Sequence, residues 1–399
     1  MKKHLLVIFF FLSAISMSYA QDTQEKTTPH MLLTDIEVQS QSTDALHSLY
    51  NFKFERADIG FRWLRYKYPQ HPLPYFLLGL SEWWKIMPNP EETRYDDKFL
   101  SYMDSTIMYA KKIYDKDPDN PEAKFFLAGA YGFKGRLHSD RKHWSKATFA
   151  AKTSLEYMNQ GKKQNSELGP EFLFGDAIYN YYHIWVGENY KFLRPVLKMF
   201  PKGNKELGLK QLNEVARNAF YTRVEAQYYL MRIYSTEENQ PAKAYPFAQY
   251  LAQTFPDNAY FERSYARAAY QQGYMDVAEK ASLSILDKID RKMSGYEATS
   301  GRYAAFYLGY IYKLIKKDNA KAKEYFQRAL KFSEETEALE AGYYIYSLLY
   351  LARIGAEEKD QNAAIKYYEL IKENADDDHE AYKEAKKYLK ANKKGGWLW

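Results

Sequence analysis

The feature that most constrains this 399-residue chain is a spacing of small and large residues that recurs through its second half. Small residues stand where two helices would touch closely, and large ones stand where the space between them would be filled. The residues in these positions are Ala278 and Ile285, then Leu308, Gly309, Tyr312, Ala322, Phe326 and Ala329, then Leu351, Ala352, Ala364, Tyr368 and Ile371. The spacing predicts an all-α chain of stacked helix pairs, because one pair cannot bury its apolar face alone.

This pattern resembles the tetratricopeptide repeat, a helix–turn–helix unit of about 34 residues. The resemblance covers most of 43–375 and is most specific in 224–375, where regular repeats are expected at 224–256, 259–290, 302–334 and 345–375. It implies a right-handed α-solenoid with a concave face. Such folds are scaffolds for partners, so the resemblance implies a non-enzymatic binding protein.

The first twenty residues have the three parts of a secretory signal peptide. Lys2 and Lys3 form a basic start, 5–15 is apolar, and Ser18 to Ala20 offers a small-residue cleavage site. The apolar run is shorter than the ~20 residues that span a bilayer. We therefore expect cleavage after Ala20 and a periplasmic mature protein, and the Gln21 that follows is typical of exported chains from Bacteroidota.

The remaining chain divides by composition into a flexible leader at 21–42, a solenoid at 43–391 and a tail at 392–399. Within the solenoid, an apolar insertion with two prolines at about 188–202 departs from the repeat. We also expect an enlarged turn from Gly132 to His143, a polar linker at 159–170 and a helix lengthened through 335–344.

Composition excludes several classes of protein. The chain has no cysteine, which removes disulfides, thiolate metal sites and a lipid-anchor cysteine. A formal net charge of +6 over 399 residues gives no basic block of the kind that binds nucleic acid. No G-x-S-x-G, H-E-x-x-H or phosphate-binding glycine loop is present, so we expect no enzyme activity, no cofactor and no metal.

Inward positions of the first helix in each repeat carry mainly aromatic rings and cations. Projected on the repeat, the groove residues are Glu225, Tyr228, Arg232, Tyr260, Arg263, Arg267, Tyr270, Tyr303, Phe306, Tyr310, Lys313, Tyr346 and Arg353. Rings give large contact area, and arginine grips carboxylates with two parallel hydrogen bonds. These groove residues therefore predict an acidic protein or peptide partner. We expect that partner to belong to an envelope or secretion complex. The sequence does not indicate the oligomeric state.

Two alternatives stay open at this stage. Stacked aromatics also suit glycans, and starch-binding surface lipoproteins share such helices, although they carry long loops and a lipid-anchor cysteine that this chain lacks. His138, Asp140 and His143 are residue types that bind zinc, but only two imidazoles are available and neighbouring cations would repel a metal. His183, on the aromatic helix expected at 171–187, is interpreted as a core histidine.

Overall fold

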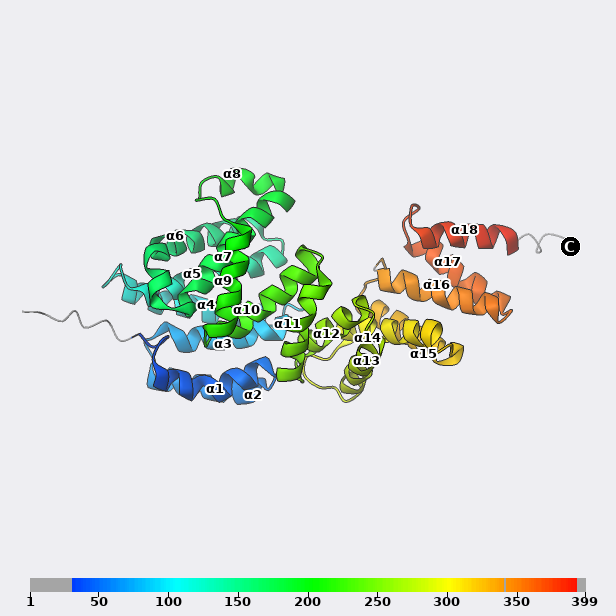
Figure 1. The fold of residues 1–399 in the computed structure, drawn as a ribbon, viewed down its shortest axis with the longest axis horizontal. Helices are drawn as coiled ribbons and strands as arrows, with labels where there is room; N and C mark the ends of the chain where they lie inside the picture. Colours follow the sequence, from blue (N-terminus) through cyan, green and yellow to red (C-terminus); the bar gives the residue numbers. More distant parts are fainter. Residues whose placement is uncertain (1–30, 341, 393–399) are drawn as a thin grey trace, which may run out of the picture.

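The computed structural model describes residues 31–340 and 342–392, and the regular structure within these ranges is entirely helical (Figure 1). Most consecutive helices pair into helical hairpins, which we number 1 to 8. The hairpins are α1 (Ile36–Tyr50) with α2 (Phe54–Lys67), α3 (Pro72–Ile86) with α4 (Asp96–Tyr114), α5 (Pro121–Asp140) with α6 (Trp144–Leu168), α7 (Pro170–Asn189) with α9 (Lys205–Asn218), α10 (Arg223–Arg232) with α11 (Pro241–Thr254), α12 (Ala259–Gln271) with α13 (Met275–Asp290), α14 (Ala298–Tyr310) with α15 (Asn319–Glu335), and α16 (Gly342–Glu357) with α17 (Gln361–Asn374). The helix α18 (Glu380–Asn392) packs on the last hairpin.

Three short elements complete the chain. The insertion between α7 and α9 forms a 3-10 turn, η1 (Lys191–Leu193), and the one-turn helix α8 (Arg194–Leu197). Two π-helical turns, η2 (Ile233–Glu237) and η3 (Ile311–Ile315), extend α10 and α14. The insertion predicted at 188–202 is therefore a distinct segment between two hairpin helices.

Close helix contacts explain the small residues of the repeat. A Cβ atom on Gly309 would lie 2.6 Å from the ring of Phe326, so any larger residue in α14 would push α15 away. Ala278, Ala322 and Ala352 are fully buried at equivalent contacts. The chain is thus an all-α stack of tetratricopeptide-type hairpins, as its spacing predicted.

Four predicted boundaries need correction. α1 begins at Ile36 rather than near residue 44. α5 continues to Asp140, so no enlarged turn starts at Gly132, and α6 runs to Leu168 through the predicted linker. α15 ends at Glu335, shortly before Glu337, which has a left-handed backbone conformation. The segment 335–344 therefore does not lengthen this helix, contrary to the prediction.

The α5 and α15 corrections have local physical causes. Gly135 stays helical because it brings α5 against α6, where an added Cβ would lie 3.3 Å from the backbone nitrogen of Ala151. Glu337 has φ +52°, a conformation that no α-helix continues. The predicted signal peptide, residues 21–30 of the leader and all of the tail except residue 392 lie outside the described residues.

Hairpins 1 to 5 turn back on themselves, and we call residues 36–254 the N-terminal body. The indole N–H of Trp84 in α3 donates to a carboxylate oxygen of Glu225 in α10 at 2.8 Å. Asn258, which caps α12, donates its side-chain N–H to the carbonyl of Tyr50 in α1 at 2.8 Å. Tyr50 also donates to Glu225, so hairpins 1 and 2 lie against hairpin 5 and the start of hairpin 6, and the solenoid closes.

Two glutamates in the first turns of α5 and α7 hold this closure. Glu122 accepts the backbone N–H of Leu33 at 2.6 Å, which fixes the segment before α1. Glu171 accepts the backbone N–H groups of Tyr221 and Thr222 at 2.8 and 3.1 Å, which fixes the segment before α10. Both carboxylates are buried, and hydrogen bonds to a charged group are stronger than neutral ones.

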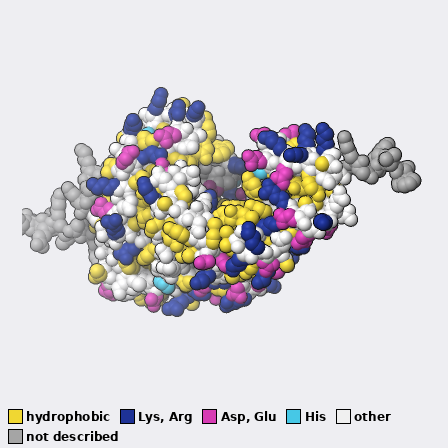
Figure 2. Space-filling model, turned by 45° about the vertical axis from the view of Figure 1, so that its right-hand side comes forward, with side chains coloured by type: hydrophobic (Ala, Val, Ile, Leu, Met, Phe, Trp, Pro, Cys, Tyr) yellow, Lys and Arg dark blue, Asp and Glu magenta, His cyan; other side chains and the backbone are white. Residues whose placement is uncertain are grey.

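The remaining hairpins, with α18, extend away from the body as an arm (Figure 1). We call residues 259–392 the C-terminal arm. Its inner layer is α12, α14 and α16, which contact one another in order. In a space-filling view, hydrophobic side chains gather around the notch between body and arm (Figure 2).

Candidate functional site

The predicted groove residues fall into three surroundings. Tyr228 and Arg232 line the interior of the body, and Tyr260 and Arg263 lie where the body meets the arm. The other predicted residues lie on the first helices of the arm: Arg267, Tyr270, Tyr303, Phe306, Tyr310, Lys313, Tyr346 and Arg353.

Within the body, the inward positions contact other parts of the same chain. Tyr228 is fully buried, and its hydroxyl accepts a hydrogen bond from the guanidinium of Arg136 at 2.9 Å. Arg232 forms an ion pair with Glu237 at 3.3 Å. Glu225 is buried beneath Trp84. In this conformation Tyr228 and Glu225 are not accessible to a protein partner.

Two predicted groove residues, Arg263 and Tyr260, lie at the junction of body and arm. Arg263 donates to the carbonyl of Pro88 in the loop after α3 and to the hydroxyl of Ser300, both at 3.0 Å. Tyr260 stands edge-on to Trp84, with ring centroids 6.4 Å apart. Burial lowers the pKa of Arg263, since the charged guanidinium loses water there. Arg263 therefore joins the two regions.

The arm keeps a partly open inner face. Tyr346 is 39% exposed, and Tyr270, Tyr303 and Tyr310 are half-buried. Phe306, in contrast, is buried against the ring of Tyr343 at 4.7 Å. A ladder of tyrosines thus remains within reach of solvent along three consecutive hairpins.

Two predicted cations of the arm already have carboxylate partners. Lys313 contacts Glu357, and Arg353 forms two parallel hydrogen bonds with Glu384, at 2.9 and 2.6 Å. These pairs join neighbouring elements of the arm. Any binding role for Lys313 and Arg353 stays a prediction, and it requires these contacts to open.

Arg267 and Arg302 differ from the other cations. The Nε atom of each is buried and donates to no acceptor among the described residues. Neither has a carboxylate at ion-pair distance within the same ranges, and Arg302 lies over the ring of Tyr303, 5.3 Å from its centroid. The sequence analysis missed Arg302, although its position beside an inward tyrosine was a usable signal.

A second site, missed by the sequence analysis, lies inside the body. A chamber of about 530 Å³ is lined by α3, α5, α6, α7 and α10, and we call it the body chamber. Its walls are rich in aromatic side chains, including Phe76, Phe126, Phe133, Phe172, Tyr182 and Trp185. The sequence carried a trace of it in the aromatic stripe of α7 and in Gly129 and Gly132, which line the same space on α5.

Within the described ranges, charged side chains line this chamber at six positions, which are Lys124, Arg136, Asp140, Asp176, Glu225 and Arg232. Arg136 donates to the hydroxyls of Tyr228 and Tyr229 and lies 4.6 Å from the ring centroid of Trp83. Burial raises the pKa of Glu225 to about 7, against the opposing effects of Trp84 and of the positive charge on Arg136. One oxygen of this carboxyl, Oε2, is buried and has no hydrogen-bond partner among the described residues.

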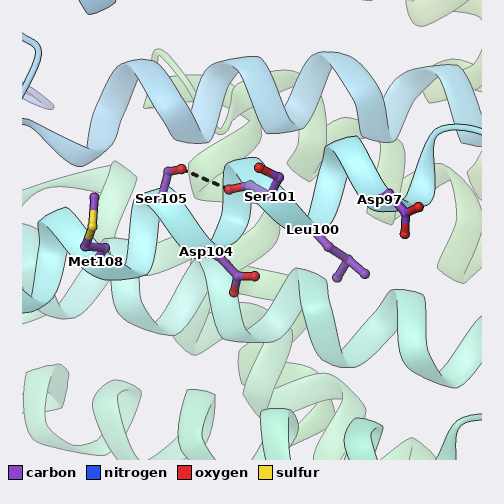
Figure 3. Close-up of a pocket in the computed structure, with 6 residues that line it drawn as sticks. All are labelled: Asp97, Leu100, Ser101, Asp104, Ser105 and Met108. Carbon is purple, nitrogen blue, oxygen red and sulfur yellow. Dashed lines mark hydrogen bonds between the residues drawn. The ribbon is translucent and has the colours of Figure 1, made fainter.

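A depression of about 430 Å³ on the surface of α4 is not a candidate binding site. All six residues that line it come from this one helix, and they follow its surface (Figure 3). The hydroxyl of Ser105 donates to the carbonyl of Ser101 at 2.9 Å, and Asp104 pairs with Lys134 of α5. The groups there already have intramolecular partners, so this surface offers no organised binding site.

The histidines noted in the sequence have ordinary surroundings. The rings of His138 and His143 lie 6.0 Å apart, and positive charge on Lys146 and Lys134 adds to burial in lowering the pKa of His138. Within the described ranges no three His, Asp or Glu side chains gather as metal ligands would. His183 is half-buried and contacts the carbonyl of Leu197 in the insertion.

Comparison with known proteins gives similarity of architecture. No protein-family model matches the chain, and no curated protein does. Among solved structures it is similar to the human IFIT1 dimer with PPP-AAAA, at 15% identity and a TM-score of 0.40, over 79% of this chain and 67% of that one. Yeast Tom70 is 14% identical with a TM-score of 0.38, over 80% and 63% of the two chains. The P58(IPK) TPR domain is 14% identical with a TM-score of 0.25, over 90% and 99%.

The class of protein follows from the chain's own hairpins and their small-residue contacts. This is an all-α helical-repeat protein whose hairpins are of the tetratricopeptide type. None of the helices in the described ranges has the length and apolar character that crossing a bilayer requires.

Proposed function

We propose that this protein is a non-enzymatic scaffold that binds an acidic segment of a protein partner on the inner face of its C-terminal arm. The observation that carries the proposal is the pair Arg267 and Arg302, whose buried Nε–H groups have no acceptor among the described residues. A buried donor without a partner costs about 1–3 kcal/mol. A partner carboxylate would supply that acceptor and could engage the guanidinium with two parallel bonds.

The tyrosines beside these arginines supply the rest of the surface. Tyr303, Tyr310 and Tyr346 follow one another on the inner faces of α14 and α16 and remain partly exposed. Tyrosine offers a large ring that loses little conformational entropy on binding, with a hydroxyl for hydrogen bonds. An extended segment could contact several hairpins at once.

Glycan binding fits this face less well. A sugar ring stacks on an open aromatic face, but several of these faces are covered within the arm. Tyr270 stacks on Tyr307 with centroids 4.4 Å apart, and Tyr350 stacks on Phe326 at 5.0 Å. The uncompensated arginines favour an acidic peptide instead.

The experiment compares two double variants of the full chain. The first variant, Arg267→Glu with Arg302→Glu, reverses both inner-face charges. The second variant, Arg291→Glu with Lys331→Glu, makes the same charge change at two exposed positions, one at the end of α13 and one on α15. The probe is a fluorescent peptide of glutamate and phenylalanine, beside a glutamine version of it. Arg263 is left intact because its change would break the body–arm contact.

We expect the inner-face variant to bind the acidic peptide at least about tenfold more weakly, as charge-assisted hydrogen bonds are worth ~1.5–3 kcal/mol. The exposed variant and the wild type should bind it alike, and binding should weaken with salt. Equal binding by a folded inner-face variant, or equal affinity for the glutamine peptide, would contradict the proposal. Arg267→Gln with Arg302→Gln replaces the first variant if the reversed charges unfold the arm.

We also propose that the chain is exported, cleaved after Ala20 and active in assembling a periplasmic envelope or secretion complex. The basic, apolar and small-residue parts of 1–20 support export. Mass spectrometry of the protein from the periplasmic fraction should find Gln21 as the first residue. A periplasmic species that begins at Met1 would contradict this part.

A further inference from the structure

We propose that the body chamber binds a long-chain carboxylate, such as a fatty acid, with its chain along α5 and α7 and its head group between Arg136 and Glu225. This site is separate from the inner face of the arm. The proposal rests on the shape of the chamber, its walls and the polar groups that face it.

The chamber is long and has the size of a ligand site. Its volume of about 530 Å³ lies within the ~300–1,000 Å³ of typical small-molecule pockets. On α5 the lining residues run from Lys124 to Asp140, which at 1.5 Å per residue is a length of about 24 Å. On α7 they run from Phe172 to Val186, nearly as far. An extended chain suits this shape better than a compact ring system.

The two ends of the chamber differ. Leu33, Leu73 and Phe172 line one end, where Glu122 holds the backbone of Leu33 and keeps that segment in place. Lys124, whose amine pairs with Asp119, and Asp176 also line the chamber near this end. Trp185 and Leu193 line the other end, beside the insertion. An alkyl chain would therefore point toward the Leu33 end, and the polar head toward the insertion.

Arg136 provides the binding group for an anionic head. In the described part of the chain its hydrogen bonds go to two phenolic hydroxyls and, weakly, to the sulfur of Met87, and no carboxylate lies at ion-pair distance. A partly buried guanidinium without a charged partner is costly, and a carboxylate ligand would offset that cost. Arg232 on α10 also lines the chamber, but it already forms an ion pair with Glu237.

Glu225 supplies the second head-group contact. It is 4% exposed and lines the chamber, its Oε1 accepts from Trp84, and its buried Oε2 has no partner among the described residues. Burial raises the pKa of this carboxyl to about 7, so near neutral pH a large fraction carries a proton. A protonated Oε2 can donate that hydrogen to a ligand carboxylate while Arg136 donates to the same head.

The rim of the chamber is suited to an amphiphile. Trp144 is 51% exposed and Phe192 is 65% exposed, and their rings meet edge-on at 6.5 Å. Lys191, Arg194 and Lys198 are exposed on the insertion. Apolar rings next to cations attract a molecule that has an alkyl chain and an anionic head.

The test measures binding of three twelve-carbon probes to the full chain by calorimetry below their micelle concentrations. The probes are dodecanoate, dodecanol and dodecylammonium, and lysophosphatidic acid is added as the lipid-derived source of an anionic head. We expect saturable binding of one dodecanoate, with dodecanol at least about tenfold weaker and dodecylammonium weaker still. Tighter binding of lysophosphatidic acid would identify a phospholipid source and overturn the carboxylate assignment.

Two variants locate the site. Ile178→Trp fills the chamber from α7 and should abolish dodecanoate binding. Arg136→Met keeps the length of the side chain but removes its charge, and should weaken dodecanoate at least about tenfold while leaving dodecanol unchanged. Lys146→Gln is the matched control, since it removes one exposed positive charge from α6 outside the chamber.

Several outcomes would overturn the proposal. They are no saturable dodecanoate binding to the wild type, equal affinity for dodecanol, or unchanged binding by a folded Ile178→Trp variant. Circular dichroism establishes whether each variant is folded. If Arg136→Met does not fold, the probe series on the wild type still decides whether the head group must be anionic.

Discussion

The N-terminal body and the C-terminal arm are built from the same kind of hairpin, yet they use their inner faces in opposite ways. In the body, Trp84 and Tyr228 are completely buried where the first hairpins meet the fifth. In the arm, Tyr346 at an inward position stays 39% exposed, and Arg267 has a buried donor for which the described ranges contain no acceptor. The repeat therefore fixes the local stack, whereas closure depends on which side chains the inner faces carry.

Closure also changes what each region can bind. The body encloses a chamber of a size that suits a small molecule, and Arg136 and Glu225 are among the polar groups that line it. The arm presents a surface that a polypeptide could reach. The two sites that we propose therefore differ in class although they are built from one repeat.

The largest effect we expect comes from removing matched inner-face aromatics. Trp84→Ala should destabilise the body by about 3–5 kcal/mol, because it leaves a cavity and removes the donor to Glu225. Tyr346→Ala in the arm should cost less, about 1 kcal/mol, because 39% of the side chain is already exposed to solvent. Urea unfolding followed by circular dichroism measures both, and equal losses would contradict the difference between the regions.

The second expected effect is a pH dependence that comes from Glu225 in the body. Folding raises the pKa of Glu225 from 4.5 to about 7, so between these values the folded state holds a proton that the unfolded state has lost. Stability should therefore fall as the pH rises through this window, by up to about 3 kcal/mol, and then level off.

Glu225→Gln is the control for this slope. The amide keeps an acceptor for Trp84 and Tyr50 but does not titrate. The difference in unfolding free energy between wild type and variant should shrink or change sign from about pH 4.5 to about pH 7. Parallel curves for the two proteins would show that Glu225 ionises normally.

The smallest effect we expect is a difference in coupling energy between two arginine–carboxylate pairs of similar geometry. Arg141 contacts Asp96 in the body at 2.6 and 2.9 Å, with both side chains mostly buried, whereas Arg353 and Glu384 in the arm are 43% and 35% exposed. Double-mutant cycles should give a coupling energy of ~1.5–3 kcal/mol for the body pair. The arm pair should give ~0.2–1 kcal/mol. A stronger coupling in the arm would reverse the comparison.

The sequence predicted local structure well where side-chain spacing decides it. The small residues at 309, 322 and 352 lie at helix contacts, and the aromatic helix expected at 171–187 is α7. The prediction of a turn from Gly132 was wrong, because α5 continues through Gly132 and Gly135. These glycines are helical because they pack against α6, and that tertiary contact is not visible in the local sequence.

Closure and the chamber could not be predicted in this way. The contact between Trp84 and Glu225 joins residues 141 apart, and nothing in the period of the repeat specifies it. Inward positions could be projected, but the projection did not distinguish an open face from one covered by another hairpin. Tyr228 and Arg267 occupy comparable positions, yet one is fully buried and the other is half-buried.

The central claim is that the body is closed and the arm is open, and cysteine labelling tests it most directly because the chain has no cysteine. Ser42→Cys reports on the inner face of α1, where Ser42 is fully buried beside Tyr221. Tyr346→Cys reports on the arm, and Ser101→Cys on the exposed face of α4 is the reference. We expect maleimide to react with Ser42→Cys more than about 100-fold more slowly than with Ser101→Cys, and with Tyr346→Cys within about tenfold of it. Equal rates for Ser42→Cys and Ser101→Cys in folded protein would show that the body is open and contradict the account.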